Sequence, residues 1–121
     1  MNFILDTNVV IYLQKGLLAE PLPHGSAAIS IITEIELRGF PGLLVEQTLW
    51  LGRFLASIHS LGITSDIKES TIRLRRAHRL KIPDAIIAAT TLTHGAVLLT
   101  NDEQLHAVPG LTSRPLALKK P

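Results

Sequence analysis

The sequence predicts an α/β protein with a mostly parallel central sheet. Short apolar runs of strand length, at Phe3–Leu5, Ala27–Ile29 and Ala96–Leu99, alternate with segments whose apolar residues recur at helical spacing. Capping or polar residues follow these runs, where a helix would begin. Strands that alternate with helices build parallel sheets through right-handed crossovers.

The helices follow from periodicity, capping and breaking residues, and are expected over 9–13, 30–38 and 44–58, then from Asp66 and from Pro83. Gly39 and Gly62 end the second and third of these helices. Asp66 has Glu69 three residues on, as in a capping box, and proline is favoured at a first helical position. Two further short strands are expected at 63–64 and, at an edge, 111–112.

Composition excludes several classes of protein. The 121 residues are 46% hydrophobic and 18% charged, which indicates a globular chain with a real core rather than a disordered one. The chain has no cysteine, and therefore neither disulfides nor a thiolate metal site. We expect a cytoplasmic protein, because its start lacks a signal peptide pattern and no apolar stretch reaches the ~18 residues of a membrane span. A formal charge of +2 does not by itself indicate a nucleic-acid partner.

Four acids are predicted to meet at one edge of the sheet. Asp6 and Asp102 follow strands, while Glu34 and Asp84 lie near the amino ends of helices. In a parallel sheet these strand and helix ends share one edge, which is where open α/β sheets bind ligands. Read alone, Asp6 is also explained as the cap of the helix that follows it.

Four crowded carboxylates repel one another, so they cannot all stay ionised unless a cation or raised pKa values relieve the charge. Oxygen donors without histidine or cysteine suit Mg²⁺ or Mn²⁺, and a substrate phosphate commonly completes such a site. The chemistry predicted is metal-assisted hydrolysis of a phosphodiester bond. Thr7, Asn8 and Thr100 are expected to hydrogen-bond the carboxylates and orient them.

Other acids near these positions are interpreted differently. The capping box explains Asp66, and Glu36, two positions after Glu34, is expected to face elsewhere on the helix. Glu103 is the residue that would replace Asp102 if the fourth acid is misassigned, and the sequence leaves open whether Asn101 assists it.

The four acidic segments together resemble a PIN domain, specifically the VapC-type toxin of a type II toxin–antitoxin system. Each segment alone is unspecific, but their order and spacing together are specific, and the resemblance extends from Phe3 to about Leu105. Many members of the family have an aromatic residue after the last acid, where this chain has Leu105. The fourth acidic segment is the one that varies most in the family. The matching segments are Ile4–Asn8, Ser30–Glu34, Ile82–Thr90 and Leu98–Asp102.

The resemblance implies a three-layer α/β/α sandwich, with residues 1–121 forming a single PIN-like nuclease domain. It implies a Mg²⁺- or Mn²⁺-dependent endoribonuclease that acts on structured RNA, such as transfer or ribosomal RNA. The metal-coordinating acids would be Asp6, Glu34, Asp84 and Asp102. The implied partners are the RNA, a cognate antitoxin whose carboxyl-terminal segment covers the site, and a second copy in a homodimer that can enter a larger assembly.

Two other functions remain open from the sequence. A non-catalytic RNA- or protein-binding module can use the same fold. An aspartate-nucleophile phosphatase also begins with an acid after its first strand, but it usually needs a second Asp where this chain has Asn8.

Arg73, Arg76 and Arg79 form a helical stripe, for which a solvated face is favoured over an RNA contact. His59, His78 and His106 are expected at the surface. The apolar residues of the first and third helices are expected to fill the core, with a partner groove as the alternative.

Overall fold

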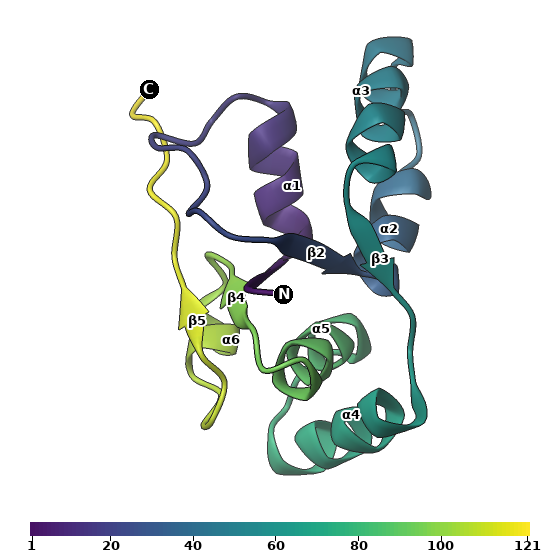
Figure 1. Cartoon of the computed structure of the whole chain (residues 1–121), viewed down its shortest axis with the longest axis vertical. Helices are drawn as coiled ribbons and strands as arrows, with labels where there is room; N and C mark the ends of the chain where they lie inside the picture. Colours follow the sequence, from purple (N-terminus) through teal and green to yellow (C-terminus); the bar gives the residue numbers. More distant parts are fainter.

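The computed structural model describes residues 1–121 and contains one five-stranded sheet in which every strand pair is parallel (Figure 1). The strand order is β3-β2-β1-β4-β5, so the chain moves outward from β1 first to one side and then to the other. The predicted parallel α/β fold is confirmed. The strands are β1 (Phe3–Leu5), β2 (Ala27–Ser30), β3 (His59–Leu61), β4 (Val97–Leu99) and β5 (Ser113–Arg114).

Helices cover both faces of this sheet and make it the middle of three layers (Figure 1). Helices α1 and α3 lie over one face, and α4 and α5 lie over the other. No helix combines the length and apolar character needed to cross a membrane. The helices are α1 (Thr7–Gln14), α2 (Ile31–Arg38), α3 (Val45–Ala56), α4 (Ser65–Ala77), α5 (Ile82–Thr93) and α6 (Glu103–His106).

The alternation of side chains along β1 explains why this short strand is central. Phe3 and Leu5 pack with Val9 and Val10 of α1, whereas Ile4 packs with the alanine-rich face of α5 on the other side. Successive side chains of a strand point to opposite faces, so a strand covered on both faces must be apolar at every position. The strand therefore ends at Leu5, directly before the polar residue Asp6.

Several predicted boundaries differ from the structure. The third strand lies at His59–Leu61 rather than 63–64, because α3 already ends at Ala56. This strand pairs only with β2 at the sheet edge, where polar residues are tolerated and hide the apolar signal. The cap of α4 is Thr64, whose hydroxyl accepts a hydrogen bond from the Ile67 amide at 3.2 Å, so Asp66 lies in the first turn.

Two differences concern the end of the chain. The last strand lies at Ser113–Arg114 rather than 111–112. The short helix α6 was not predicted, because its four residues are too few to display a helical period.

Candidate active site

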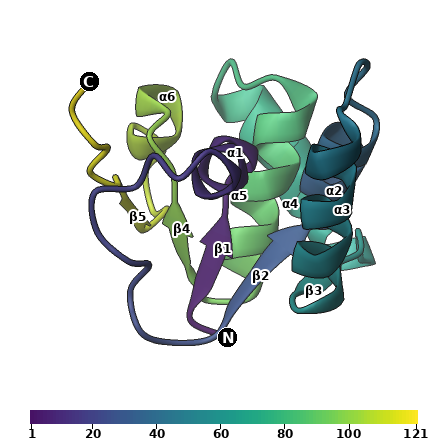
Figure 2. The same cartoon turned by 90° about the horizontal axis from the view of Figure 1, so that it is seen from above.

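Asp6 lies at the carboxyl end of β1, as predicted, and is also the N-cap of α1. Its Oδ1 accepts a hydrogen bond from the Thr7 amide at 2.8 Å, and the residue is only 5% exposed. A buried carboxylate that is fixed by its neighbours is poised for an interaction with something other than water. The arrowheads of β1 and β4 point towards the side of the molecule where α6 lies (Figure 2). Asp6 lies at this edge, because it directly follows β1.

The hydroxyl of Thr100 connects two of the predicted acids. It donates a hydrogen bond of 2.6 Å to Oδ2 of Asp6 and accepts one of 3.0 Å from the amide of Asp102. Asp102 in turn caps α6, because its Oδ1 accepts from the Gln104 amide at 2.9 Å. The ends of β1 and β4 are therefore joined at one point, although Asp6 and Thr100 are 94 residues apart.

Burial, together with neighbouring negative charge, raises the pKa of two acids. Burial raises the pKa of Asp6 most, the charges of Asp102 and Glu36 raise it further, and the hydrogen bonds from Thr100 and Thr7 oppose the rise. Burial also raises the pKa of Asp84, in the first turn of α5, and the charges of Asp102, Asp6 and Glu36 add to it. Asp6, Asp84, Asp102 and Glu36 thus form one cluster, to which we refer as the acidic cluster.

The structure corrects the predicted position of Glu34, because it brings Glu36 to the cluster instead. The Thr7 hydroxyl donates a 2.7 Å hydrogen bond to Oε1 of Glu36, and the same hydroxyl lies 3.0 Å from that of Thr33. Thr33 and Glu36 are three residues apart and therefore share a face of α2. Residues two apart point in nearly opposite directions, so Glu34 cannot share that face.

Glu34 has a local partner of its own. Its Oε2 lies 3.0 Å from Nη1 of Arg38, four residues later on α2. The nearby Ser60 hydroxyl and Arg38 lower the pKa of Glu34, although the Ser60 Oγ has no partner within hydrogen-bond geometry. The spacing Glu34-x-x-x-Arg38 was visible in the sequence and is typical of an exposed helix pair. This signal could have assigned the site to Glu36.

The residues around Asp102 have separate roles. Both polar atoms of the Asn101 side chain bond the backbone of Leu116, at 2.7 and 3.0 Å, so Asn101 anchors the carboxyl-terminal segment. Glu103 is exposed at the start of α6. Asn8 is also exposed, and no hydrogen bond joins its side chain to an acid.

The sequence predicted His106 at the surface, but the structure shows that it is half-buried. Its Nε2 lies 2.8 Å from the Thr100 carbonyl oxygen, and its Nδ1 lies 2.6 Å from the Ser113 hydroxyl. A carbonyl oxygen only accepts, so Nε2 carries the proton of this hydrogen bond. His106 thereby ties β5 to the loop that carries Thr100.

The oxygen donors of the acidic cluster are of the kind that a hard divalent cation binds. They do not, however, surround a common point closely enough to form a complete coordination shell. As they stand, no three acids or histidines lie close enough together to hold an ion directly. Mg²⁺ keeps several of its waters and often binds through only one or two carboxylates. Asp6 and Asp84, whose pKa values their neighbours raise, are the side chains that would hold such an ion, with Asp102 and Glu36 beside them.

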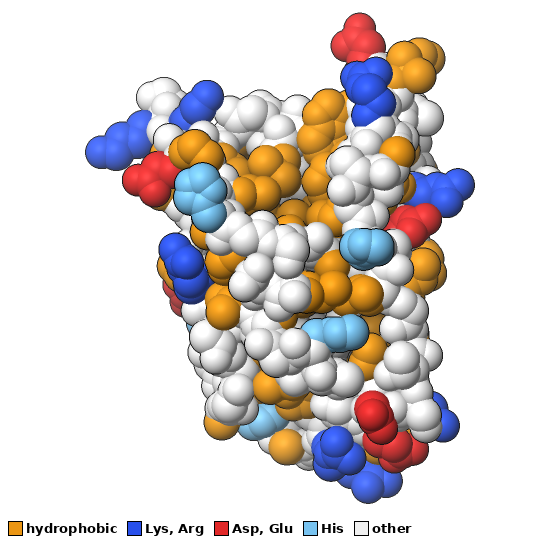
Figure 3. Space-filling model, viewed as in Figure 1, with side chains coloured by type: hydrophobic (Ala, Val, Ile, Leu, Met, Phe, Trp, Pro, Cys, Tyr) orange, Lys and Arg blue, Asp and Glu red, His pale blue; other side chains and the backbone are white.

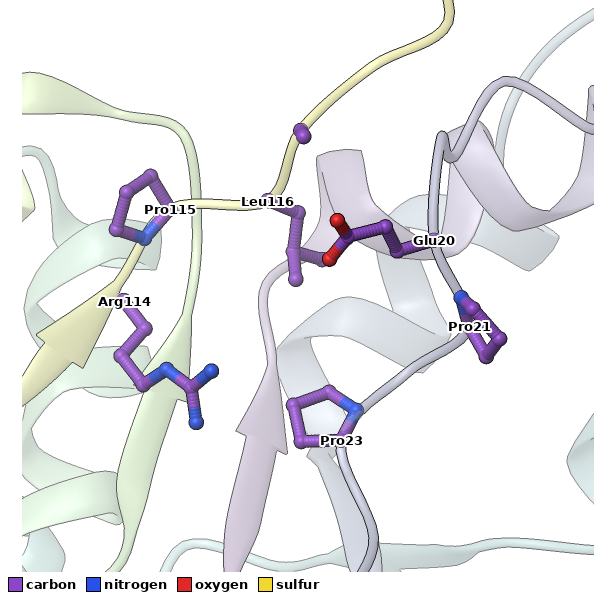
Figure 4. Close-up of a pocket in the computed structure, with 7 residues that line it drawn as sticks. Glu20, Pro21, Pro23, Arg114, Pro115 and Leu116 are labelled. Atoms are coloured by element: carbon purple, nitrogen blue, oxygen red, sulfur yellow. The ribbon is translucent and has the colours of Figure 1, made fainter.

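A cavity elsewhere in the molecule contains none of these acids. It has a volume of about 170 Å³ and lies between the loop that precedes β2 and the segment that follows β5 (Figure 4). Glu20 and Arg114 face it from these two segments, but no ion pair joins them. The cavity therefore contributes nothing to the acidic cluster.

The raised pKa values predict how stability depends on pH. The metal-free folded state holds the protons of Asp6 and Asp84 to a higher pH than the unfolded chain does, so stability falls as pH rises above the usual carboxyl range. Asp84→Asn should raise the free energy of unfolding of metal-free protein at pH 7, by about 0.5–2 kcal/mol. Urea denaturation in EDTA measures this effect.

The matched control is Asp66→Asn, which also removes an acid from the first turn of a helix but lies outside the acidic cluster. It should lower stability slightly, since an acid there favours the helix dipole. The gain of Asp84→Asn should shrink towards pH 3.5, and an equal gain at both pH values would contradict the electrostatic explanation.

The parallel sheet between helix layers, with acids where its central strands end, defines an α/β/α domain with a carboxylate-lined edge. Within this class, the chain belongs to the PIN domain family, whose model matches residues 3–111. None of the curated proteins matches the chain.

Solved structures agree with this assignment. A toxin–antitoxin complex from Klebsiella pneumoniae is 31% identical, with a TM-score of 0.72 over 92% of this chain and 96% of that one. VapBC-5 from Mycobacterium tuberculosis is 25% identical, with a TM-score of 0.74 over 94% and 96%. DNA-bound VapBC from Salmonella typhimurium shares the fold, with a TM-score of 0.81 over 95% and 98% at 23% identity.

Proposed function

We propose that the chain is the toxin of a VapBC-type toxin–antitoxin pair and acts as a Mg²⁺- or Mn²⁺-dependent endoribonuclease. The observation that carries the proposal is the acidic cluster, in which burial and the charges of Asp102 and Glu36 raise the pKa of both Asp6 and Asp84. Membership of the PIN domain family and the similarity to a toxin–antitoxin complex support it. The substrates expected from the resemblance are structured RNAs, such as transfer or ribosomal RNA.

Each residue of the cluster has a definite part in this proposal. Asp6 and Asp84 would hold the ion, with Asp102 and Glu36 as further oxygen donors, directly or through water. A bound divalent ion lowers the pKa of a water and stabilises charge on a phosphoryl oxygen. Thr100 keeps Asp6 in one orientation through the 2.6 Å hydrogen bond.

Thr7 serves Glu36 in the same way through its 2.7 Å hydrogen bond. We therefore propose Glu36, and not Glu34, as the acid that α2 supplies to the metal site. Loss of such an orienting partner typically costs 10–100-fold in metal affinity or activity.

An antitoxin partner is supported by apolar surface around α3. Four large apolar side chains of α3 and of the turn before it are between 57% and 76% exposed, namely Phe40, Leu44, Val45 and Leu49. Figure 3 shows further apolar side chains gathered between α1 and α3. Clustered apolar surface of this kind is typical of a protein interface. The homodimer remains a further prediction, tested by sedimentation of the purified toxin.

The proposed activity is tested with purified protein and structured RNA. Transfer RNA and ribosomal RNA are incubated with Mg²⁺, with Mn²⁺ and with EDTA, and the products are resolved on denaturing gels. We expect discrete fragments with either ion and none with EDTA.

Calorimetric titration of Mg²⁺ and Mn²⁺ separates this proposal from the non-catalytic module. Intact RNA together with no heat of metal binding would refute the nuclease and favour the binding module. Asp84→Asn, which should neither bind the ion tightly nor cleave, excludes a contaminating nuclease.

A further inference from the structure

The positive charge of the chain is concentrated in one segment. Residues 70–83 contain five of the twelve Lys and Arg residues and no Asp or Glu. The rest of the chain has seven basic and ten acidic residues, so this segment supplies the whole of the +2 net charge. We refer to its basic side chains as the basic arm, namely Arg73, Arg75, Arg76, Arg79 and Lys81.

The basic arm borders the acidic cluster. It comprises the last two turns of α4 and the connection into α5, and Lys81 is the N-cap residue of the helix whose first turn holds Asp84. The Lys81 ammonium is close enough to oppose the rise in the pKa of Asp84. The arm therefore leads along the chain directly to the proposed metal site.

No ion pair joins this arm to an acid of the protein. All five residues are exposed, and the only ion pair in the structure joins Arg38 to Glu34, on α2. Arg73 and Arg76 are three residues apart on α4, a spacing at which like charges on a helix repel. The predicted arginine stripe does not continue as a helix to Arg79, because α4 ends at Ala77 and His78 is extended. An ordinary solvated helix face mixes both signs of charge, whereas this one carries positive charge only from Arg73 onward.

We infer that the basic arm binds the phosphate backbone of the RNA and guides it to the acidic cluster. This inference rests on the proposed function and assigns its substrate-binding surface. An acidic cluster repels a polyanion, so a nuclease of this design needs positive charge beside the cluster to hold the strand. Arginine suits this role because its planar guanidinium binds phosphate oxygens in pairs.

The experiment measures RNA binding without cleavage. Wild-type protein in EDTA is titrated against a fluorescein-labelled RNA hairpin of about twenty nucleotides, with anisotropy as readout, from about 50 to 200 mM salt. The test variant is Arg75→Gln/Arg79→Gln. The control is Lys15→Gln/Arg53→Gln, which removes two exposed positive charges outside the arm.

We expect the arm variant to bind the hairpin about tenfold more weakly at ~0.1 M salt. The slope of log affinity against log salt should become shallower by about one for each lost phosphate contact, and thus by about two. The control should keep the wild-type slope. In the Mg²⁺ cleavage assay, KM should rise with little change in kcat, because contacts to distant phosphates are equal in the ground and transition states.

The outcomes separate this inference from the nuclease proposal. If the wild type binds RNA through the basic arm but cleaves nothing, the nuclease proposal fails and the inference that the arm binds RNA is supported. If cleavage is metal-dependent but both double variants bind alike, the arm inference is overturned. It is also overturned if the arm variant keeps its RNA affinity and loses only an acidic protein partner.

Discussion

Asp6→Asn is expected to lower metal-dependent RNA cleavage by at least about a hundredfold. Substitution of groups that merely orient a metal ligand costs 10–100-fold, so loss of a ligand charge should cost no less. The asparagine keeps an oxygen that can accept from the Thr7 amide, so the cap of α1 is retained. Single-turnover cleavage of a labelled transfer RNA in Mg²⁺ measures the effect, because it reports the chemical step without product release.

Two measurements show whether this loss reflects the site or the fold. Thermal unfolding in EDTA should give Asp6→Asn a midpoint near or above that of the wild type, since a buried negative charge is removed. The midpoint of the wild type should rise with added Mn²⁺ and that of the variant much less. Wild-type cleavage rates in a folded Asp6→Asn protein would rule out the acidic cluster as the active site.

The second large effect distinguishes the two acids of α2. Glu36→Gln should reduce cleavage by about 10–100-fold, since the neutral amide is a weaker ligand of a hard cation. Glu34→Gln should stay within about threefold of the wild type, because Glu34 pairs with Arg38 and lies apart from the cluster. The two variants make the same chemical change two residues apart on one helix, so each is the matched control of the other.

Stability should reveal the same division between these two acids. Glu34→Gln weakens an exposed pair of about 0.3–0.5 kcal/mol. Glu36→Gln relieves repulsion in the cluster and should be neutral or slightly stabilising. Loss of cleavage in Glu34→Gln, with full activity in Glu36→Gln, would restore the sequence-based choice and overturn the site described by the structure.

The order of the elements was predictable because apolar periodicity and caps are local signals. Phe3–Leu5 is apolar at every position because both its faces are covered, and Pro83 lies at the start of α5 as expected. The edge strand β3 was misplaced because one neighbour and partial exposure impose little pattern on its residues. A partly exposed edge strand therefore shows little of the apolar pattern by which buried strands are predicted.

The site was predicted at the level of elements but not of every side chain. Topology brings the ends of β1, α5 and β4 together, so the proximity of Asp6, Asp84 and Asp102 follows from strand order. Which acid of α2 joins them depends on the rotation of that helix about its axis. The Thr33–Glu36 and Glu34–Arg38 spacings in the sequence carried this information. However, Glu34 and Glu36 both satisfied the requirement for an acid near the start of the helix.

The 2.6 Å hydrogen bond between Thr100 and Asp6 spans 94 residues of sequence. Asp102 and the Thr100 hydroxyl that orients Asp6 are therefore missing from the site until β4 has been synthesised and has inserted beside β1. A ribosome-bound fragment that ends before β4 has Asp6 but neither Thr100 nor Asp102, and such long-range pairing is also the slow part of folding. The site is thus completed only late in translation, and under the proposed function this order would delay cleavage until the chain is nearly finished.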